Sequence, residues 1–118
     1  MLEEQKIRNY LLNLSKNEKA DSVYLFRLDF EETPIETILS SIVNLYEEVN
    51  NLKNIIEERF EHEDRTLTKE EAVKQAEIIK DYGRKSVVLE KILCNDLIYD
   101  YVIDRIVTIE QDKKNKNL

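Results

Sequence analysis

The side chains that could carry chemistry gather in one charged stretch of this sequence. Residues 57–65 read EERFEHEDR and include His62, the only histidine in the chain. The acidic residues of this stretch are Glu57, Glu58, Glu61, Glu63 and Asp64. Glu58 and His62 are four residues apart and could share a metal ion, but a dimetal site inside a helical bundle needs Glu-x-x-His spacing and carboxylates from several helices. That spacing is absent, so we predict that His62 is exposed at a helix end and that the protein uses no metal or cofactor.

The single cysteine and the single glycine limit the chemistry further. Cys94 cannot form a disulfide or a cysteine-based zinc cluster within one chain, and we expect a buried structural thiol in a reducing compartment. One glycine, Gly83, is too few for a glycine-rich phosphate loop. The usual mononucleotide and dinucleotide folds are therefore excluded.

The pattern Glu57-Glu58-x-x-Glu61 resembles the paired-acid helix of the all-helical MazG-type nucleotide pyrophosphatases. In that family, clustered carboxylates hold Mg²⁺ against a substrate triphosphate, so the resemblance implies a Mg²⁺-dependent nucleotide pyrophosphatase. The family's second acidic motif has the form Glu-x-x-Asp, whereas Glu77 and Asp81 are four residues apart here. A charged, solvated helix end accounts for the same residues without catalysis, and this non-enzymatic interpretation is the leading one.

The net charge of −7 at pH 7 repels the phosphates that dominate nucleic-acid affinity, so we expect no direct binding to DNA or RNA. The same charge permits an acidic decoy, in which residues 57–71 would occupy the nucleic-acid-binding site of another protein. No apolar run approaches the roughly 18 to 20 residues that cross a bilayer, and the first residues are unlike a signal peptide. We therefore expect a cytoplasmic protein, and the frequent Ile, Lys, Asn, Glu and Tyr indicate a low-GC bacterium or its mobile element.

Long helices must position these side chains, because one glycine and one proline in 118 residues leave few turn-forming positions. Residues 2–14 carry apolar residues at spacings of three and four and predict a short first helix, followed by a connection at 15–21. Residues 23–30 read VYLFRLDF and alternate as a strand does, yet no second strand is evident to pair with them. This segment is either a strand that pairs with its copy in a second subunit, a helix, or an extended lid.

The clearest helix signal begins at residues 33–36. Thr33 can cap a helix, Pro34 suits the first helical position, and Glu36 can complete a capping box. Six aliphatic residues follow at alternating spacings of four and three, which is the period of a coiled-coil seam. These residues, called the seam below, are Ile38, Ile42, Leu45, Val49, Leu52 and Ile56. We predict that the seam packs against a partner helix in the core or at an interface.

A second long helix is predicted from Thr68, because residues 68–71 form another capping-box pattern. Gly83 is expected to interrupt or kink it. Two apolar faces between residues 88 and 109 predict that the last helix is the most deeply buried one. Asn95 either lies in the seam of this helix or caps a separate final helix.

These patterns predict an all-α fold, namely a bundle of about three to five long amphipathic helices. Residues 1–112 would form a single helical domain and residues 113–118 a disordered polar tail. The leading hypothesis for function is a non-enzymatic, acidic protein-interaction module with an accessory or regulatory role. Its partner would be another protein or a second copy of the chain. We expect a homodimer with the seam in or beside its core, since the chain carries more apolar helix surface than one helical hairpin can cover.

Overall fold

The computed structural model describes residues 2–17, 28–60 and 67–116. Its elements are α1 (Leu2–Asn17), α2 (Ile35–Ile55), the π-helical turn η2 (Ile56–Phe60), α3 (Lys69–Leu93) and α4 (Asp96–Lys116). No strand occurs in these three ranges, so the predicted all-α fold is confirmed. Within the same ranges, no helix has both the length and the apolar character that a membrane crossing requires.

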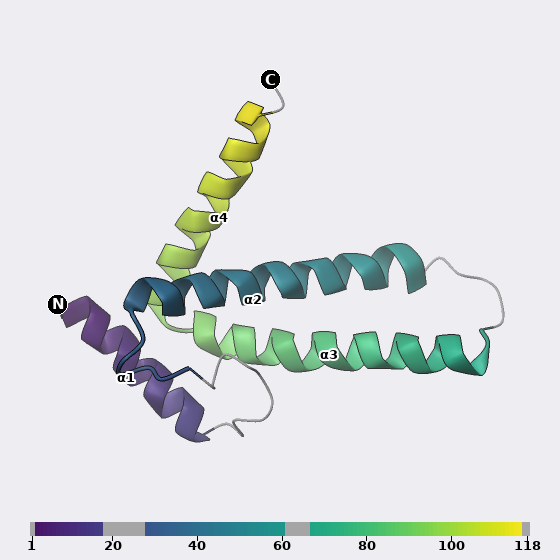
Figure 1. Cartoon of the computed structure of the whole chain (residues 1–118), viewed down its shortest axis with the longest axis horizontal. Coiled ribbons are helices and arrows are strands. Elements are labelled where there is room, and N and C mark those ends of the chain that lie inside the picture. Colours follow the sequence, from purple (N-terminus) through teal and green to yellow (C-terminus); the bar gives the residue numbers. More distant parts are fainter. Residues whose placement is uncertain (1, 18–27, 61–66, 117–118) are drawn as a thin grey trace.

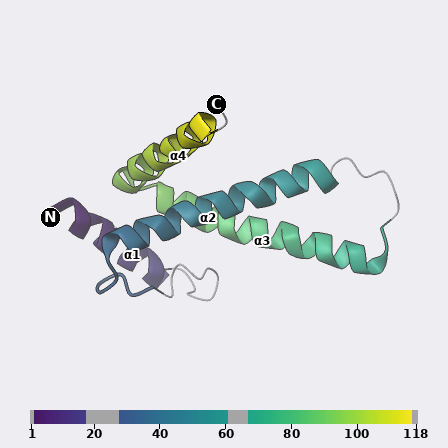
Figure 2. The same ribbon diagram turned by 45° about the horizontal axis from the view of Figure 1, so that its top comes forward.

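Two of the helices, α2 and α3, form a hairpin, and α1 and α4 lie at one end of it (Figure 1). α2 and α3 run antiparallel as the long arms of the hairpin, and α1 packs beside the end where α2 begins and α3 stops. α4 starts at that same end and then runs away from the hairpin, as Figure 2 shows from a second direction. The molecule therefore has two diverging arms, the hairpin and α4.

The hydrophobic core lies where the four α-helices meet. Its buried side chains are Ile7, Leu11, Phe30, Ile38, Leu39, Ile42, Val43, Leu45, Val88, Leu89, Ile92, Ile98 and Val102. None of the described residues between 46 and 87 is fully buried. Each fully buried aliphatic side chain contributes about 1.5–3 kcal/mol, so the stabilising burial is concentrated at one end of the hairpin.

α3 begins with the capping box that the sequence predicts at residues 68–71. The backbone N–H of Glu71 donates to Thr68 Oγ1 at 3.2 Å, and the Thr68 hydroxyl donates to Glu71 Oε1 at 3.0 Å. These reciprocal contacts between the first turn and its cap form a capping box.

The start of α2 differs from the prediction, because Pro34 and not Thr33 occupies the cap position. Pro34 has an extended ψ of 140°, and its carbonyl accepts the first hydrogen bonds of the helix, from the N–H groups of Thr37 (3.0 Å) and Ile38 (3.2 Å). Thr33 instead closes the preceding turn, in which its N–H donates to the carbonyl of Asp29 at 2.9 Å. No side chain caps α2, so the prediction of a Thr33 cap is wrong.

The junction between α3 and α4 is a true break, which decides between the two alternatives for Asn95. Asn95 Oδ1 accepts a hydrogen bond from the N–H of Ile98 at 3.1 Å, the contact of an N-cap residue. Gly83 does not interrupt or kink α3, contrary to the prediction, since the helix is continuous from Lys69 to Leu93. A glycine costs an interior helical position only about 1 kcal/mol, which is too little to break a helix of 25 residues.

The last helix is less buried than predicted. Only Ile98 and Val102 of α4 are fully buried, whereas α2 supplies five buried side chains. The two apolar faces predicted between residues 88 and 109 are divided between α3 and α4, so their five buried side chains, Val88, Leu89, Ile92, Ile98 and Val102, belong to two helices. Ile106 and Ile109 of α4 are only partly buried against the core, and the last helix is therefore less buried than α2. At its far end, α4 continues to Lys116 and includes residues 113–116, which the sequence analysis assigns to a polar tail.

The ambiguous segment 23–30 is described only in part. Residues 23–27 lie outside the described ranges, and residues 28–30 belong to neither a helix nor a strand. Phe30 is buried in the core and Leu28 packs against it, while Asp29 between them is exposed. These two apolar side chains therefore cover the core at the entrance to α2.

The diverging arms make the molecule extended for its size. The radius of gyration is 17.0 Å, compared with about 13.5 Å for a compact domain of 118 residues. The accessible surface is 8675 Å², compared with roughly 6,700 Å² for a typical folded monomer of this mass. The chain therefore exposes roughly 1,900 Å² more surface than a compact monomer would.

Candidate interaction surface between α2 and α4

A notch opens between α2 and α4 just beyond the core. It has a volume of about 190 Å³ and is lined by Tyr46, Glu47, Asn50, Asn51, Ile106, Ile109, Glu110 and Lys113. Tyr46, Ile106 and Ile109 are partly buried and pack against the core. The apolar core thus reaches the surface in this α2–α4 notch, and charged and amide side chains surround it.

The base of α4 is fixed to α2 by a hydrogen bond between their side chains. The hydroxyl of Tyr101 donates to Glu36 Oε2 at 3.0 Å. Burial raises the pKa of the Tyr101 hydroxyl, the bond to Glu36 and its negative charge raise it further, and the positive charge of Arg105 acts in the opposite direction. The phenol stays protonated at neutral pH and remains a donor. Glu36, predicted as part of a capping box, therefore holds α4 in place.

An ion pair network joins α2 to α3. Lys85 Nζ lies 2.5 Å from Glu48 Oε1 and 3.1 Å from Asp81 Oδ2, and the Lys85 side chain is 18% exposed. Burial acts to lower the pKa of the Lys85 ammonium, but the hydrogen bonds and charges of Glu48 and Asp81 outweigh it, so the pKa is raised. The ammonium is held in its charged form and ties the middle of α3 to α2.

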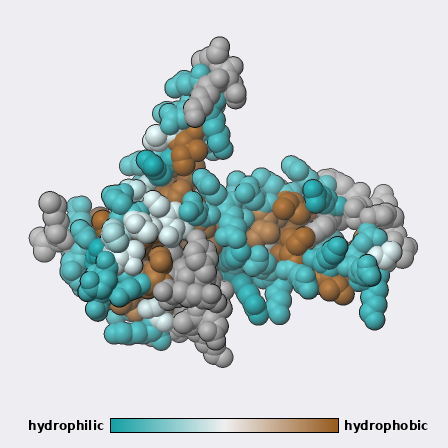
Figure 3. All heavy atoms as spheres, in the orientation of Figure 1, coloured by the Kyte–Doolittle hydropathy of each residue, from teal (hydrophilic) through white to brown (hydrophobic). Residues whose placement is uncertain are grey.

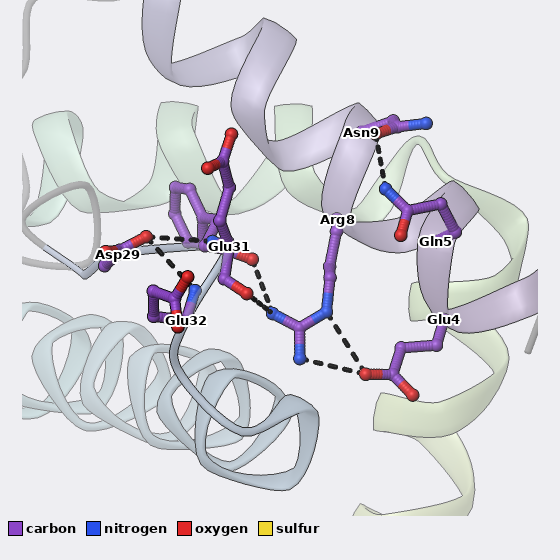
Figure 4. Close-up of polar contacts among 8 residues, drawn as sticks. Glu4, Gln5, Arg8, Asn9, Asp29, Glu31 and Glu32 are labelled. Atoms are coloured by element: carbon purple, nitrogen blue, oxygen red, sulfur yellow. Dashed lines mark hydrogen bonds and ion pairs between the residues drawn. The ribbon is translucent and has the colours of Figure 1, made fainter.

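Arg8 of α1 fixes the chain segment that leads into α2 (Figure 4). Its guanidinium pairs with Glu4 Oε1 (Nη2 to Oε1, 2.9 Å) and donates to the backbone carbonyl of Phe30 at 2.5 Å. Asp29 Oδ1 accepts hydrogen bonds from the N–H groups of the two residues at 31 and 32, at 3.0 and 3.2 Å. Tyr10, also on α1, donates its hydroxyl to the backbone carbonyl of Lys91 near the end of α3. These contacts hold the start of α2, and with it the α2 wall of the notch, in a defined position.

The chemistry of the notch suits the binding of a protein. A partly exposed apolar patch surrounded by polar side chains is the usual composition of a site that receives an apolar side chain from a partner. In the described part of the chain, no three His, Cys, Asp or Glu side chains come together in a group that could bind a metal ion.

The structure divides the seam into two halves. Ile38, Ile42 and Leu45 are completely buried within one chain. Val49 is half-buried and packs against the core, and Leu52 and Ile56 are half-buried farther along the hairpin. The near half of the seam is therefore core, and only its far half remains accessible to a partner. That the seam serves as an interface stays a prediction.

The residues of the charged stretch are described only in part. Glu57 and Glu58 are exposed on the π-helical turn η2, at the end of the hairpin far from the core. Glu61, His62, Glu63 and Asp64 lie outside the described residues. Asp81, the aspartate considered for the second acidic motif, is paired with Lys85. The decoy and the pyrophosphatase both stay predictions.

Cys94 is exposed and not buried, so that prediction is wrong. It follows the last residue of α3, where the chain turns toward α4 before Asn95 caps that helix. The connection between two helices lies at the surface, so Cys94 is not enclosed by neighbouring helices.

The notch has no signature in the sequence. Tyr46, Ile106 and Ile109 each fit an apolar helix face in the sequence, but nothing local relates a position in α2 to one in α4. The one sequence feature that points toward the notch is Tyr46, which widens the apolar face of its helix beside the seam.

No protein-family model, no curated protein and no solved structure matches this chain.

Proposed function

We propose that this protein is a small, non-enzymatic interaction module whose α2–α4 notch receives an apolar segment of a protein partner. The observation that carries the proposal is that Tyr46, Ile106 and Ile109 continue the core to the surface of the notch. A concave site in which a few apolar side chains are surrounded by polar ones is suited to receive an apolar side chain of a partner. An accessory or regulatory role fits a chain of this size.

The extended shape supports the same proposal. A chain that exposes roughly 1,900 Å² more than a compact monomer has surface available for association, since standard interfaces bury about 800 Å² on each partner. We place the protein in the cytoplasm, where the exposed Cys94 would stay reduced.

The test is capture of a partner by the immobilised protein and by two variants. Ile109→Asp introduces a carboxylate into the notch, and Val73→Asp introduces the same group at a 51% exposed position on α3. We expect a protein that the wild type and Val73→Asp retain and that Ile109→Asp loses, with circular dichroism showing that all three fold. Equal retention by all three proteins would refute the role of the notch.

A second measurement tests the non-enzymatic part of the proposal. We expect no Mg²⁺-dependent release of pyrophosphate from common nucleoside triphosphates. Release that Glu58→Gln abolishes would replace this proposal with the pyrophosphatase, because Glu58 is one of the paired acids that the resemblance assigns to metal binding.

A further inference from the structure

The two walls of the α2–α4 notch differ in chemistry. The α4 wall presents two apolar side chains, Ile106 and Ile109, whereas the α2 wall presents the amides of Asn50 and Asn51. Figure 3 shows hydrophobic surface on α4 close to the hairpin, with hydrophilic surface around it. An occupant that suits both walls offers an apolar group to α4 and hydrogen-bonding groups to α2.

The two amides are available to such an occupant. Asn50 and Asn51 are exposed, and neither side chain bonds to another residue in the described part of the chain. A side-chain amide carries an acceptor oxygen and N–H donors, the same pair of groups that a peptide unit offers. The peptide groups of a helix are already paired within the helix, whereas those of an extended chain are free to bond to other groups. The amide wall therefore favours an extended peptide over a helical one.

The size of the notch favours the same occupant. An apolar cavity of roughly 150 Å³ holds a benzene molecule, so the notch, at about 190 Å³, has room for one large side chain. An amphipathic helix bound in a groove instead uses several anchors, at positions i, i+3, i+4 and i+7. Residues 106–113 of α4 extend over about 10 Å, which is the length of about three extended residues. The notch therefore fits a short extended segment with a single apolar anchor.

The charged residues that line the notch define where a charge of the partner can lie. α2 and α4 both run outward from the core, so Glu47 lies nearer to the core than the amides do, and Glu110 lies nearer to it than Lys113 does. None of these three side chains forms an ion pair with another described residue. The carboxylates, one from each wall, favour a cation at the inner end, and Lys113 disfavours one at the outer end. The net charge of −7 also attracts a basic partner.

We propose that the notch binds an extended segment of a protein partner in which a large apolar residue lies next to a lysine or arginine. The apolar side chain packs on Ile106 and Ile109, and the amides of Asn50 and Asn51 pair with the peptide backbone. The basic side chain lies at the inner end, between the two carboxylates. The inference rests on the proposed function of the notch and names the chemistry of its partner.

Blocked tetrapeptides test this inference, with the backbone amide signals of the isotope-labelled protein as the readout. The main probe is acetylated, amidated alanine-leucine-lysine-alanine. One comparison peptide has glutamate in place of lysine, and another has alanine in place of leucine. We expect the main probe to shift the signals of Tyr46 and Ile109 and to bind roughly fivefold more tightly than either comparison peptide, since each lacks one of the two matching groups.

Variants of the protein assign the contacts. Asn50→Ala with Asn51→Ala should weaken binding of the main probe by roughly threefold or more, whereas Asn54→Ala, at an exposed asparagine outside the notch, should leave it unchanged. Alanine is a better helix former than asparagine, so these variants keep α2. Glu47→Gln should reduce the preference for lysine over glutamate, and Glu77→Gln, at an exposed position on α3, should not. An unchanged affinity in the double variant or an unchanged preference in Glu47→Gln would overturn the inference.

Other occupants give results of their own, and each of these also overturns the inference. A second copy of the chain would shift the notch signals on dilution of the protein without any peptide. A helical partner would be indicated if an amphipathic leucine–lysine helix bound more tightly than the main probe and was insensitive to Asn50→Ala with Asn51→Ala. Absence of any shift at the notch with roughly 10 mM of the main probe, a concentration that detects millimolar dissociation constants, excludes the extended segment.

These outcomes are separable from the test of the proposed function. If Ile109→Asp releases a captured partner while the peptides with lysine and glutamate bind equally, the notch is a binding site for a partner of different chemistry. If the main probe binds as expected while Ile109→Asp retains every captured protein, the peptide preference stands and the captured proteins bind elsewhere.

Discussion

Replacing Gly83 with alanine should stabilise the protein. Gly83 lies inside the continuous helix α3, its φ is not positive, and a Cβ added there would meet no atom within 4 Å. Alanine therefore fits without strain, and it removes the backbone freedom that makes an interior helical glycine unfavourable by roughly 0.5–1 kcal/mol. For 118 residues the unfolding entropy is about 0.25 kcal/mol per kelvin, so the melting temperature should rise by roughly 2–4 °C.

Thermal and urea unfolding followed by circular dichroism measure this effect. The protein concentration must be equal in all samples, because a dimer would make the melting temperature depend on it. Ala76→Gly, at an exposed position in the same helix, is the matched control and should lower the stability by a similar amount. If Gly83→Ala lowered the stability, either α3 would bend at this glycine in solution or another molecule would approach its backbone closely. Either result would refute the reasoning from an open, helical site.

Three further predictions test the cap, the division of the seam and the pH dependence. Thr68→Ala should cost about 0.5–2 kcal/mol of unfolding free energy, since it removes both side-chain contacts of the capping box, and denaturant titration measures the loss. Ile42→Ala should cost about 2–5 kcal/mol because Ile42 is completely buried, whereas Leu52→Ala, at a half-buried position on the far part of the hairpin, should cost clearly less; equal costs would show that the far half is more tightly packed than described. The raised pKa of Tyr101 means that its neutral form is favoured in the folded state, so its contribution is complete below about pH 10 and is lost as the pH rises through the folded value. Stability measured from pH 9 upward should therefore fall less steeply in Tyr101→Phe than in the wild type, and an unchanged slope would contradict the role of this phenol.

Much of the helical architecture follows from local chemistry. Thr68 and Glu71 are close in sequence and find each other as soon as the first turn of α3 forms, so the capping box was predictable. The spacing of four and three in the seam required a long helix whatever surrounds it, and α2 is that helix. The same local pattern misplaced the cap of α2 by one residue, because Thr33 has a competing role in the turn that precedes it.

The relation between the two arms is not a local property. An apolar position is buried only where another helix packs over it. The direction of α4 depends on the break at Asn95 together with the contact between Tyr101 and Glu36. Because α4 leaves the hairpin, Tyr99 and Val107 are exposed although their sequence pattern equals that of a buried face. The exposure of these residues and the notch between α2 and α4 therefore follow from long-range packing, while the helices that carry them follow from periodicity and capping.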